Sequence, residues 1–127
     1  MSRGAAIGAA VVLGLGLGLA GCKQPGTPAS ASEAAQLDVA TSRLSVACGY
    51  ADELTAFGGQ HPDELAYVES IAVSGAEKLA AVFARNQTGI YQGESVGAIV
   101  NDSISLLEDC GLPRARAVLE RAMANGG

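Results

Sequence analysis

The chain has 127 residues, of which 49% are hydrophobic and 17% charged, and its formal net charge is −5. This length provides one domain with one modest core and leaves no room for a second domain. The acidic balance argues against nucleic-acid binding, because contacts to phosphates require a basic surface.

Residues 1–21 have the three parts of an export signal. Arg3 gives a positively charged start, residues 5–20 are apolar, and the small residues Ala20 and Gly21 precede a cleavage site. We therefore expect residues 1–21 to be a signal peptide that is not part of the folded domain.

The end of this segment, Leu19-Ala20-Gly21-Cys22, resembles the lipobox of bacterial lipoproteins, in which an aliphatic residue and two small residues precede an obligatory cysteine. The resemblance implies cleavage before Cys22, a diacylglyceryl group on its thiol, and acylation of the new amino terminus by a palmitate-type chain. It covers only the signal and Cys22, and no family is identified for the mature domain. The protein would then be anchored in a membrane of the bacterial cell envelope, facing the periplasm or the exterior.

Two other interpretations of this segment remain open. An uncut membrane anchor is one, since the apolar stretch approaches the roughly 18 residues of a spanning helix, although Gly14, Gly16 and Gly18 disfavour a helix. An ordinary secretory signal, with Cys22 present by chance, is the other. All three interpretations place the rest of the chain outside the cytoplasm.

Removal of Cys22 from the three cysteines leaves Cys48 and Cys110, an even pair in a compartment that permits disulfides. A disulfide between them would close a loop of about 60 residues and contribute on the order of 4 kcal/mol by restricting the unfolded chain. Two buried, reduced cysteines are the alternative.

The mature sequence divides into a tether and a helical domain. Residues 22–32 are rich in Pro, Gly and Ser, which is typical of a flexible tether. From Glu33, apolar residues recur at spacings of three and four, which predicts a helix that ends at Gly58-Gly59. Residues 33–127 are the predicted helical domain.

The first predicted helix carries a second apolar flank, made by Val39, Val46, Tyr50 and Phe57. A helix with two apolar flanks is expected to be covered on much of its circumference. We expect the aromatic residues of the domain to fill the core: Tyr50, Phe57, Tyr67, Phe83 and Tyr91.

Three further helices follow in the sequence. Pro62, with acidic residues directly after it, begins a second helix that runs to Arg85. A third runs from Val96 to Cys110 and is ended by Gly111, and Pro113 begins a short last helix. That last helix is basic, and its arginines could contact anionic lipid or an acidic partner, or simply face solvent: Arg114, Arg116 and Arg121.

Short connections between helices predict antiparallel neighbours. The predicted fold class is all-α, a small up-and-down bundle of three long helices plus a short C-terminal helix, with one disulfide. Alternation at period two is nearly absent, so no sheet is expected, and residues 89–93 are interpreted as a turn between helices.

The sequence contains no recognisable catalytic constellation, and neither a cofactor nor a metal is expected. His61 is the only histidine and is expected to cap the second helix. Our hypothesis is a non-catalytic binding or structural domain that recognises an envelope protein, a peptide or a small ligand through a helix groove. The alternative is a small envelope enzyme or metal carrier that uses His61 with Asp63 and Glu64.

Overall fold

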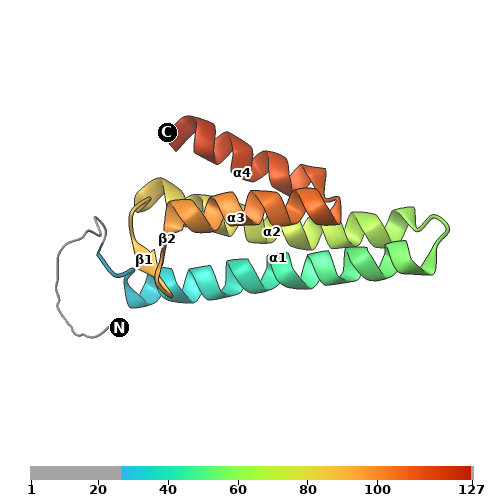
Figure 1. The fold of residues 1–127 in the computed structure, drawn as a ribbon, viewed down its shortest axis with the longest axis horizontal. Coiled ribbons are helices and arrows are strands. Elements are labelled where there is room, and N and C mark those ends of the chain that lie inside the picture. The colour runs from blue at the N-terminus through green and yellow to red at the C-terminus, as the bar shows by residue number, and fades with distance from the viewer. Residues whose placement is uncertain (1–26, 127) are drawn as a thin grey trace.

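The computed structural model describes residues 27–126 (Figure 1). Its elements are helix α1 (Ala31–Phe57), helix α2 (Pro62–Arg85), strands β1 (Ile90–Tyr91) and β2 (Glu94–Ser95), helix α3 (Val96–Cys110) and helix α4 (Pro113–Gly126). The prediction of a helical domain with four helices is confirmed. The lipobox and Cys22 lie outside the described residues, so lipidation stays a prediction.

Helix α1 begins at Ala31, two residues before the predicted start, because Ser30 caps it. The Ser30 hydroxyl accepts a hydrogen bond from the Glu33 amide, and the Glu33 carboxylate accepts one from the Ser30 amide, both at 3.1 Å. These reciprocal bonds form a capping box. The Asn86 side-chain amide also donates to Glu33, at 3.2 Å. The Ser30 amide first, and Asn86 second, lower the pKa of Glu33 from its ordinary value of 4.5.

The other predicted helix bounds agree with the structure. Gly58 follows α1 with a φ of 75°, and Gly111 follows α3 in the left-handed conformation, with a φ of 76°. Only glycine adopts these angles without strain. Ser95 caps α3 by accepting a hydrogen bond from the Ala98 amide at 3.1 Å.

The helices differ in length more than the sequence analysis expected. Helices α1 and α2 have 27 and 24 residues, whereas α3 has 15 and α4 has 14, so the prediction of three long helices is not confirmed. Helices α1 and α2 lie side by side, α3 lies along only part of them, and α4 packs on α2 and α3 (Figure 1). Within the described part of the chain, no helix is both long enough and apolar enough to cross a membrane.

The prediction that the domain contains no sheet is wrong. Strands β1 and β2 pair as an antiparallel hairpin, with Ile90 opposite Ser95. The two residues of its turn, Gln92 and Gly93, have φ values of 51° and 82°, as a type I′ turn requires. Ile90 also exchanges backbone hydrogen bonds of 2.8 Å with Thr27 and Ala29. The hairpin therefore holds the chain that leads into α1.

The core of the domain is built largely from alanine and leucine. Buried alanines let α1 and α2 approach closely, among them Ala40 on α1 and Ala72 on α2. A Cβ atom added to Gly75 would lie 3.0 Å from the Ala40 carbonyl oxygen and 3.0 Å from the Arg43 Cβ. Gly75 is thus required by the contact between the two helices.

Cys48 and Cys110 lie at disulfide distance, with their Cα atoms 5.4 Å apart, which agrees with the predicted disulfide. The pair joins the last residue of α3 to α1 at a point where α1 still has nine residues to run. Helices α1 and α2 therefore project beyond the end of α3 (Figure 1).

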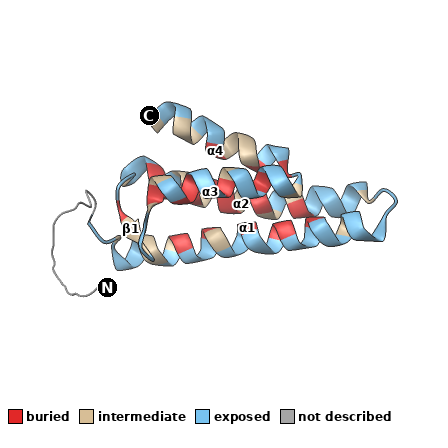
Figure 2. Cartoon of the chain, in the orientation of Figure 1, coloured by how far each residue is buried: buried red, intermediate tan, exposed pale blue. Residues whose placement is uncertain are grey.

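We call this projecting part, residues 52–67, the tip. It contains the end of α1, the connecting loop and the start of α2, and none of its residues is buried. The tip is almost entirely pale blue in Figure 2, whereas the buried residues gather where α3 lies against α1 and α2.

Candidate binding site

Three cavities of the described domain differ in size and in chemistry. One lies between α1, α3 and the hairpin, the second lies beside His61, and the third is a groove between α1 and α2 at the tip. Sites for organic ligands usually enclose about 300–1,000 Å³ and are mostly apolar, with a few polar groups. We compare the three cavities on that basis.

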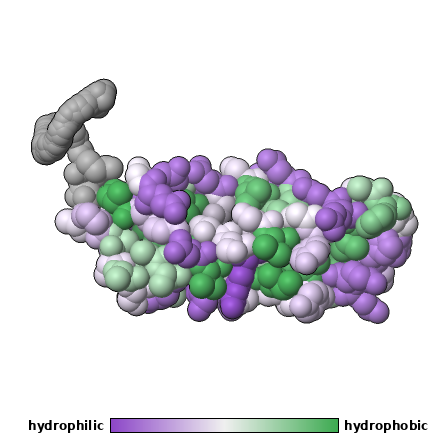
Figure 3. All heavy atoms as spheres, turned by 90° about the horizontal axis from the view of Figure 1, so that it is seen from below, coloured by the Kyte–Doolittle hydropathy of each residue, from purple (hydrophilic) through white to green (hydrophobic). Residues whose placement is uncertain are grey.

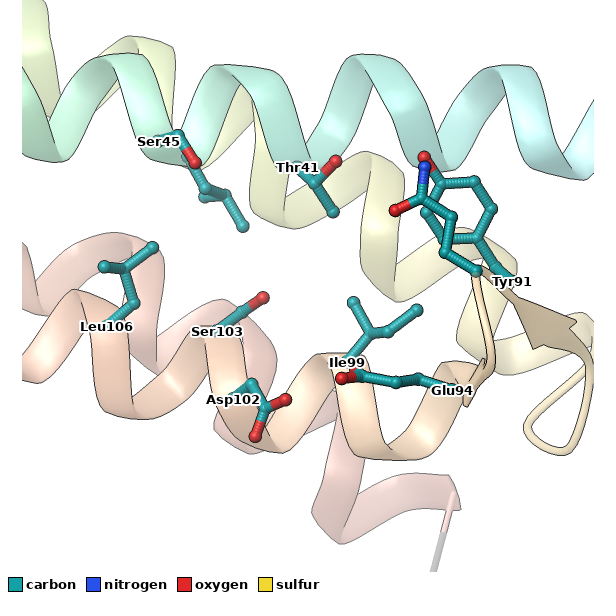
Figure 4. Close-up of a pocket in the computed structure, with 10 residues that line it drawn as sticks. Thr41, Ser45, Tyr91, Glu94, Ile99, Asp102, Ser103 and Leu106 are labelled. Carbon is teal, nitrogen blue, oxygen red and sulfur yellow. The ribbon is translucent and has the colours of Figure 1, made fainter. Parts of the chain in front are cut away.

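The cavity between α1, α3 and the hairpin is the smallest of the three, with a volume of about 270 Å³, and both polar and apolar side chains line it. Thr41 and Ser45 reach it from α1, and the buried Ser103 points its hydroxyl into it from α3 (Figure 4). Tyr91 closes one end and donates a hydrogen bond to the Asp38 carboxylate.

Two of the polar side chains around this cavity, Thr41 and Tyr91, form hydrogen bonds within the domain. The Thr41 hydroxyl donates to the Leu37 carbonyl oxygen at 2.8 Å. The hydrogen bond to Asp38 raises the pKa of Tyr91 above its ordinary value of 10.0, because the bond stabilises the protonated phenol. The volume of this cavity lies just below the usual range for an organic ligand.

The cavity beside His61 encloses about 410 Å³ and lies next to Cys110 and Gly111. His61 occupies the N-cap position of α2, but its side chain caps no amide, so that prediction is wrong. Its Nε2 atom lies 2.9 Å from the Gly58 carbonyl oxygen instead. The imidazole thus holds the α1–α2 loop.

The structure does not bring His61 together with the two neighbouring acids. Asp63 and Glu64 line the groove at the tip, whereas His61 lines the other cavity. Within residues 27–126, no group of three or more His, Cys, Asp or Glu side chains is arranged to hold a metal ion. The sequence pattern His61-Pro62-Asp63-Glu64 therefore does not form a single site.

The third cavity is an apolar groove of about 680 Å³ between α1 and α2, which we call the tip groove. Five residues of α1 form one wall: Val46, Tyr50, Glu53, Leu54 and Phe57. Their spacing of three, four, seven and eight residues places them on one face of the helix.

The second wall of the tip groove comes from the first turns of α2. Its residues share a face in the same way: Asp63, Glu64, Tyr67, Val68 and Ile71. Helix α2 turns back along α1 after the short loop, so the two walls stand side by side (Figure 1). Well-formed helices thus hold the wall residues in place.

Three of the aromatic residues that the sequence assigned to the core are exposed in this groove, so that prediction is wrong for them. Tyr50 is 49% exposed, Phe57 81% and Tyr67 68%, whereas Phe83 is 4% exposed and lies in the core. The physical reason is the face of the helix: Val39 and Val46, on the same flank of α1 as Tyr50 and Phe57, are 40% and 47% exposed although α3 runs beside that part of α1. Seen from below, the surface toward the tip mixes hydrophobic and hydrophilic patches (Figure 3).

The tip groove is acidic as well as apolar. Glu53 stands on its α1 wall, and Asp63 and Glu64 stand on its α2 wall. From residue 44 to residue 77 the sequence has six carboxylates and no Lys or Arg. The nearest cation on α1 is Arg43, one turn before Val46, and its guanidinium donates a hydrogen bond to the Ser74 hydroxyl at 2.6 Å.

The basic residues of α4 do not line the tip groove, and one of them, Arg116, forms ion pairs. Arg116 contacts the Glu120 carboxylate at 3.7 Å, one turn further along α4, and the Glu108 carboxylate at 3.9 Å. The sequence identifies the arginines of α4, but none of them lines any of the three cavities. The signal for the tip groove was the second apolar flank of α1, which we had expected to be covered.

Comparison of the chain with family models, with curated proteins and with solved structures gives no match. The function must therefore be argued from the residues of the site. Among the three cavities, the tip groove has the size, the apolar lining and the exposed aromatic side chains that are typical of a binding surface.

Proposed function

We propose that this protein is a lipid-anchored protein of the bacterial cell envelope whose helical domain binds another protein through the tip groove, without catalysing a reaction. The single observation that carries this proposal is the exposure of Tyr50, Phe57 and Tyr67 around one apolar groove. We regard the domain as an up-and-down bundle of two long and two short helices.

Exposed aromatic residues on rigid helices support a binding role. Tyr and Phe are enriched in the centres of protein interfaces, because each buries a large area at a low cost in side-chain entropy. A contiguous apolar surface on a monomeric domain is unusual unless it is covered by a partner. Since the described fold leaves the tip uncovered, a partner is the simplest explanation for these side chains.

The position of the groove also fits an anchored protein. The described chain starts beside the hairpin, at the end of α1 opposite the tip (Figure 1). At a rise of 1.5 Å per residue, the 27 residues of α1 span about 40 Å. An anchor at Cys22, five residues before Thr27, would leave the tip groove far from the membrane and accessible to a partner.

The alternative function, an envelope enzyme or metal carrier, would require His61 to act with Asp63 and Glu64. These residues line different cavities of the described domain, and the His61 imidazole is engaged with the Gly58 carbonyl. We therefore do not adopt this alternative.

The anchor is tested with the Cys22→Ser variant of the full chain. Loss of the thiol should block lipidation and the lipoprotein-specific cleavage, since the thiol carries the diacylglyceryl group. The acyl chains hold such a protein on the membrane because each buried methylene contributes about 0.8 kcal/mol. A variant that remains membrane-bound in processed form at the wild-type level would show that the lipoprotein interpretation is wrong.

Binding through the groove is tested by photocrosslinking in living cells. Benzoylphenylalanine in place of Tyr67 should form a crosslink to one defined envelope protein, identified by mass spectrometry and confirmed with the purified partner. The same residue in place of the exposed Ala124, on α4, is the matched control and should not give this product. An identical product from both positions, or none from position 67, would contradict the proposal.

A further inference from the structure

We propose that the partner of the tip groove is an amphipathic helix of about three turns, with an apolar face and with Lys or Arg along its edges. This inference rests on the proposed function and specifies the chemistry of the partner.

The shape of the groove favours a helical occupant. From Val46 to Phe57 the α1 wall covers eleven residue steps, or about 16 Å, which is the length of three helical turns. The α2 wall from Asp63 to Ile71 runs beside it. A groove between two helices accepts the apolar face of a third helix, which would insert residues at i, i+3 or i+4, and i+7.

The domain itself lacks a third helix at this place. Helices α1, α2 and α3 pack together near the hairpin, but α3 stops at Cys110, where it meets Cys48. The tip groove begins at Val46 and extends past that point. A partner helix lying in the groove would cover Tyr50 and Tyr67 on the side of the α1–α2 pair that the protein's own α3 leaves open.

Charge determines the kind of helix that fits. Glu53, Asp63 and Glu64 flank the apolar lining, and the nearest Lys or Arg residues in sequence are Arg43 and Lys78. A partner with Asp or Glu beside its apolar face would be repelled by all three carboxylates. A partner with Lys or Arg at those positions would form ion pairs with them, which favours recognition and fast association.

Two other occupants fit the groove less well. The surface of a membrane rich in anionic lipid would repel these carboxylates. A second copy of the chain offers the basic helix α4, but its apolar residues Ala115 and Leu119 are buried in their own domain. The observations therefore favour a cationic helix from a different protein.

The inference is tested by selection from a displayed library of helical peptides that contains Lys, Arg, Asp and Glu in equal amounts. The bait is the mature protein held by its anchor in nanodiscs of zwitterionic lipid. Counter-selection uses the same protein with Tyr50→Ser and Tyr67→Ser, exposed positions where the fold is not expected to change. We expect the peptides that depend on the groove to be amphipathic helices with an excess of Lys and Arg.

The charge contribution is measured on one selected peptide. The triple variant Glu53→Gln, Asp63→Asn, Glu64→Gln should weaken binding by roughly tenfold, since three exposed ion pairs each contribute modestly. The control variant Glu77→Gln, Glu94→Gln, Asp102→Asn removes the same charge from outside the groove and should change the affinity much less. Added salt should weaken binding to the wild type more than to the groove variant.

The possible outcomes separate this inference from the proposed function. Groove-dependent peptides that are neutral, acidic or extended would overturn the cationic helix and leave the groove as a binding site. If no selected peptide depends on the groove, and position 67 forms no crosslink in cells, both proposals fail. Self-association that requires Tyr67, or flotation with phosphatidylglycerol vesicles that requires it, would identify a different occupant and overturn the inference.

Discussion

The two ends of the α1–α2 pair are made of similar residues but differ in what covers them. Toward the hairpin, α3 packs on both helices and α4 packs on α2, and Leu37 and Val82 are fully buried. At the tip, residues 52–67 include no buried side chain. Phe83 and Phe57 illustrate the difference, since the first lies in the core and the second is 81% exposed.

Burial here follows helix face and helix length more than residue type, since Val39 and Val46 are 40% and 47% exposed on a flank of α1 although α3 runs beside that part of the helix. Helix α3 is twelve residues shorter than α1, which corresponds to about 18 Å of helix. The uncovered part of α1 and α2 has only one interface, the one between the two helices, so their outer apolar side chains face solvent. The domain therefore has a core at one end and a surface available for binding at the other.

The disulfide marks the boundary between the two ends, and its loss should have the largest effect on stability. Cys48→Ser combined with Cys110→Ser opens a loop whose ends are 62 residues apart. We expect the free energy of unfolding to fall by about 4 kcal/mol, because the unfolded chain gains freedom. Thermal unfolding should show a Tm lower by more than about 15 °C. An unchanged Tm, or two free thiols in protein taken from the envelope, would contradict the predicted disulfide.

The next largest effect compares two leucines of α2. Leu79→Ala removes a fully buried side chain at the covered end and should cost about 2–5 kcal/mol, because it leaves a cavity. Leu65→Ala makes the same chemical change at the tip, where the leucine is 41% exposed, and should cost about 1 kcal/mol or less. Equal losses in urea unfolding would mean that the tip is part of the core.

The third effect concerns the start of α1 and is smaller. The pKa of Glu33 is lowered in the folded protein, so its contribution to stability is present above its unfolded pKa, near 4.5, and is lost as the pH falls through the folded pKa. Glu33→Gln should remove this part of the acid sensitivity, and Asn86→Ala, which removes the second donor, should remove less of it. The free energy of unfolding is measured between pH 3 and 7, a range that extends about one unit below the ordinary Glu pKa. An unchanged pH profile in Glu33→Gln would contradict the role of the capping box.

Much of the fold was accessible from the sequence because it depends on local chemistry. Pro62 and Gly111 fix a helix start and a helix end, and the structure has both where they were predicted. Pairing of Cys48 with Cys110 followed from the cysteine count and agrees with their distance. The hairpin was missed because two-residue strands show no alternation, and Gln92-Gly93 is a less frequent turn pair than Asn-Gly.

The binding surface was harder to predict because apolar periodicity shows which faces can be buried and does not show what covers them. Val46, Tyr50 and Phe57 were recognised as a second apolar flank but were assigned to the interior. The signal for the tip groove in the sequence is this second flank itself, because residues on opposite sides of one helix cannot both face the same neighbouring helix.

The central claim is that the aromatic residues of the tip are not needed for the fold. Urea unfolding of the Phe57→Ala, Tyr67→Ala double variant tests it most directly. Both side chains are mostly exposed, and alanine favours a helix more than either aromatic residue. We expect the free energy of unfolding to change by less than about 0.5 kcal/mol per substitution, the smallest effect predicted here. A loss of about 3–5 kcal/mol per residue, as for a buried aromatic side chain, would place the tip in the core and contradict the account.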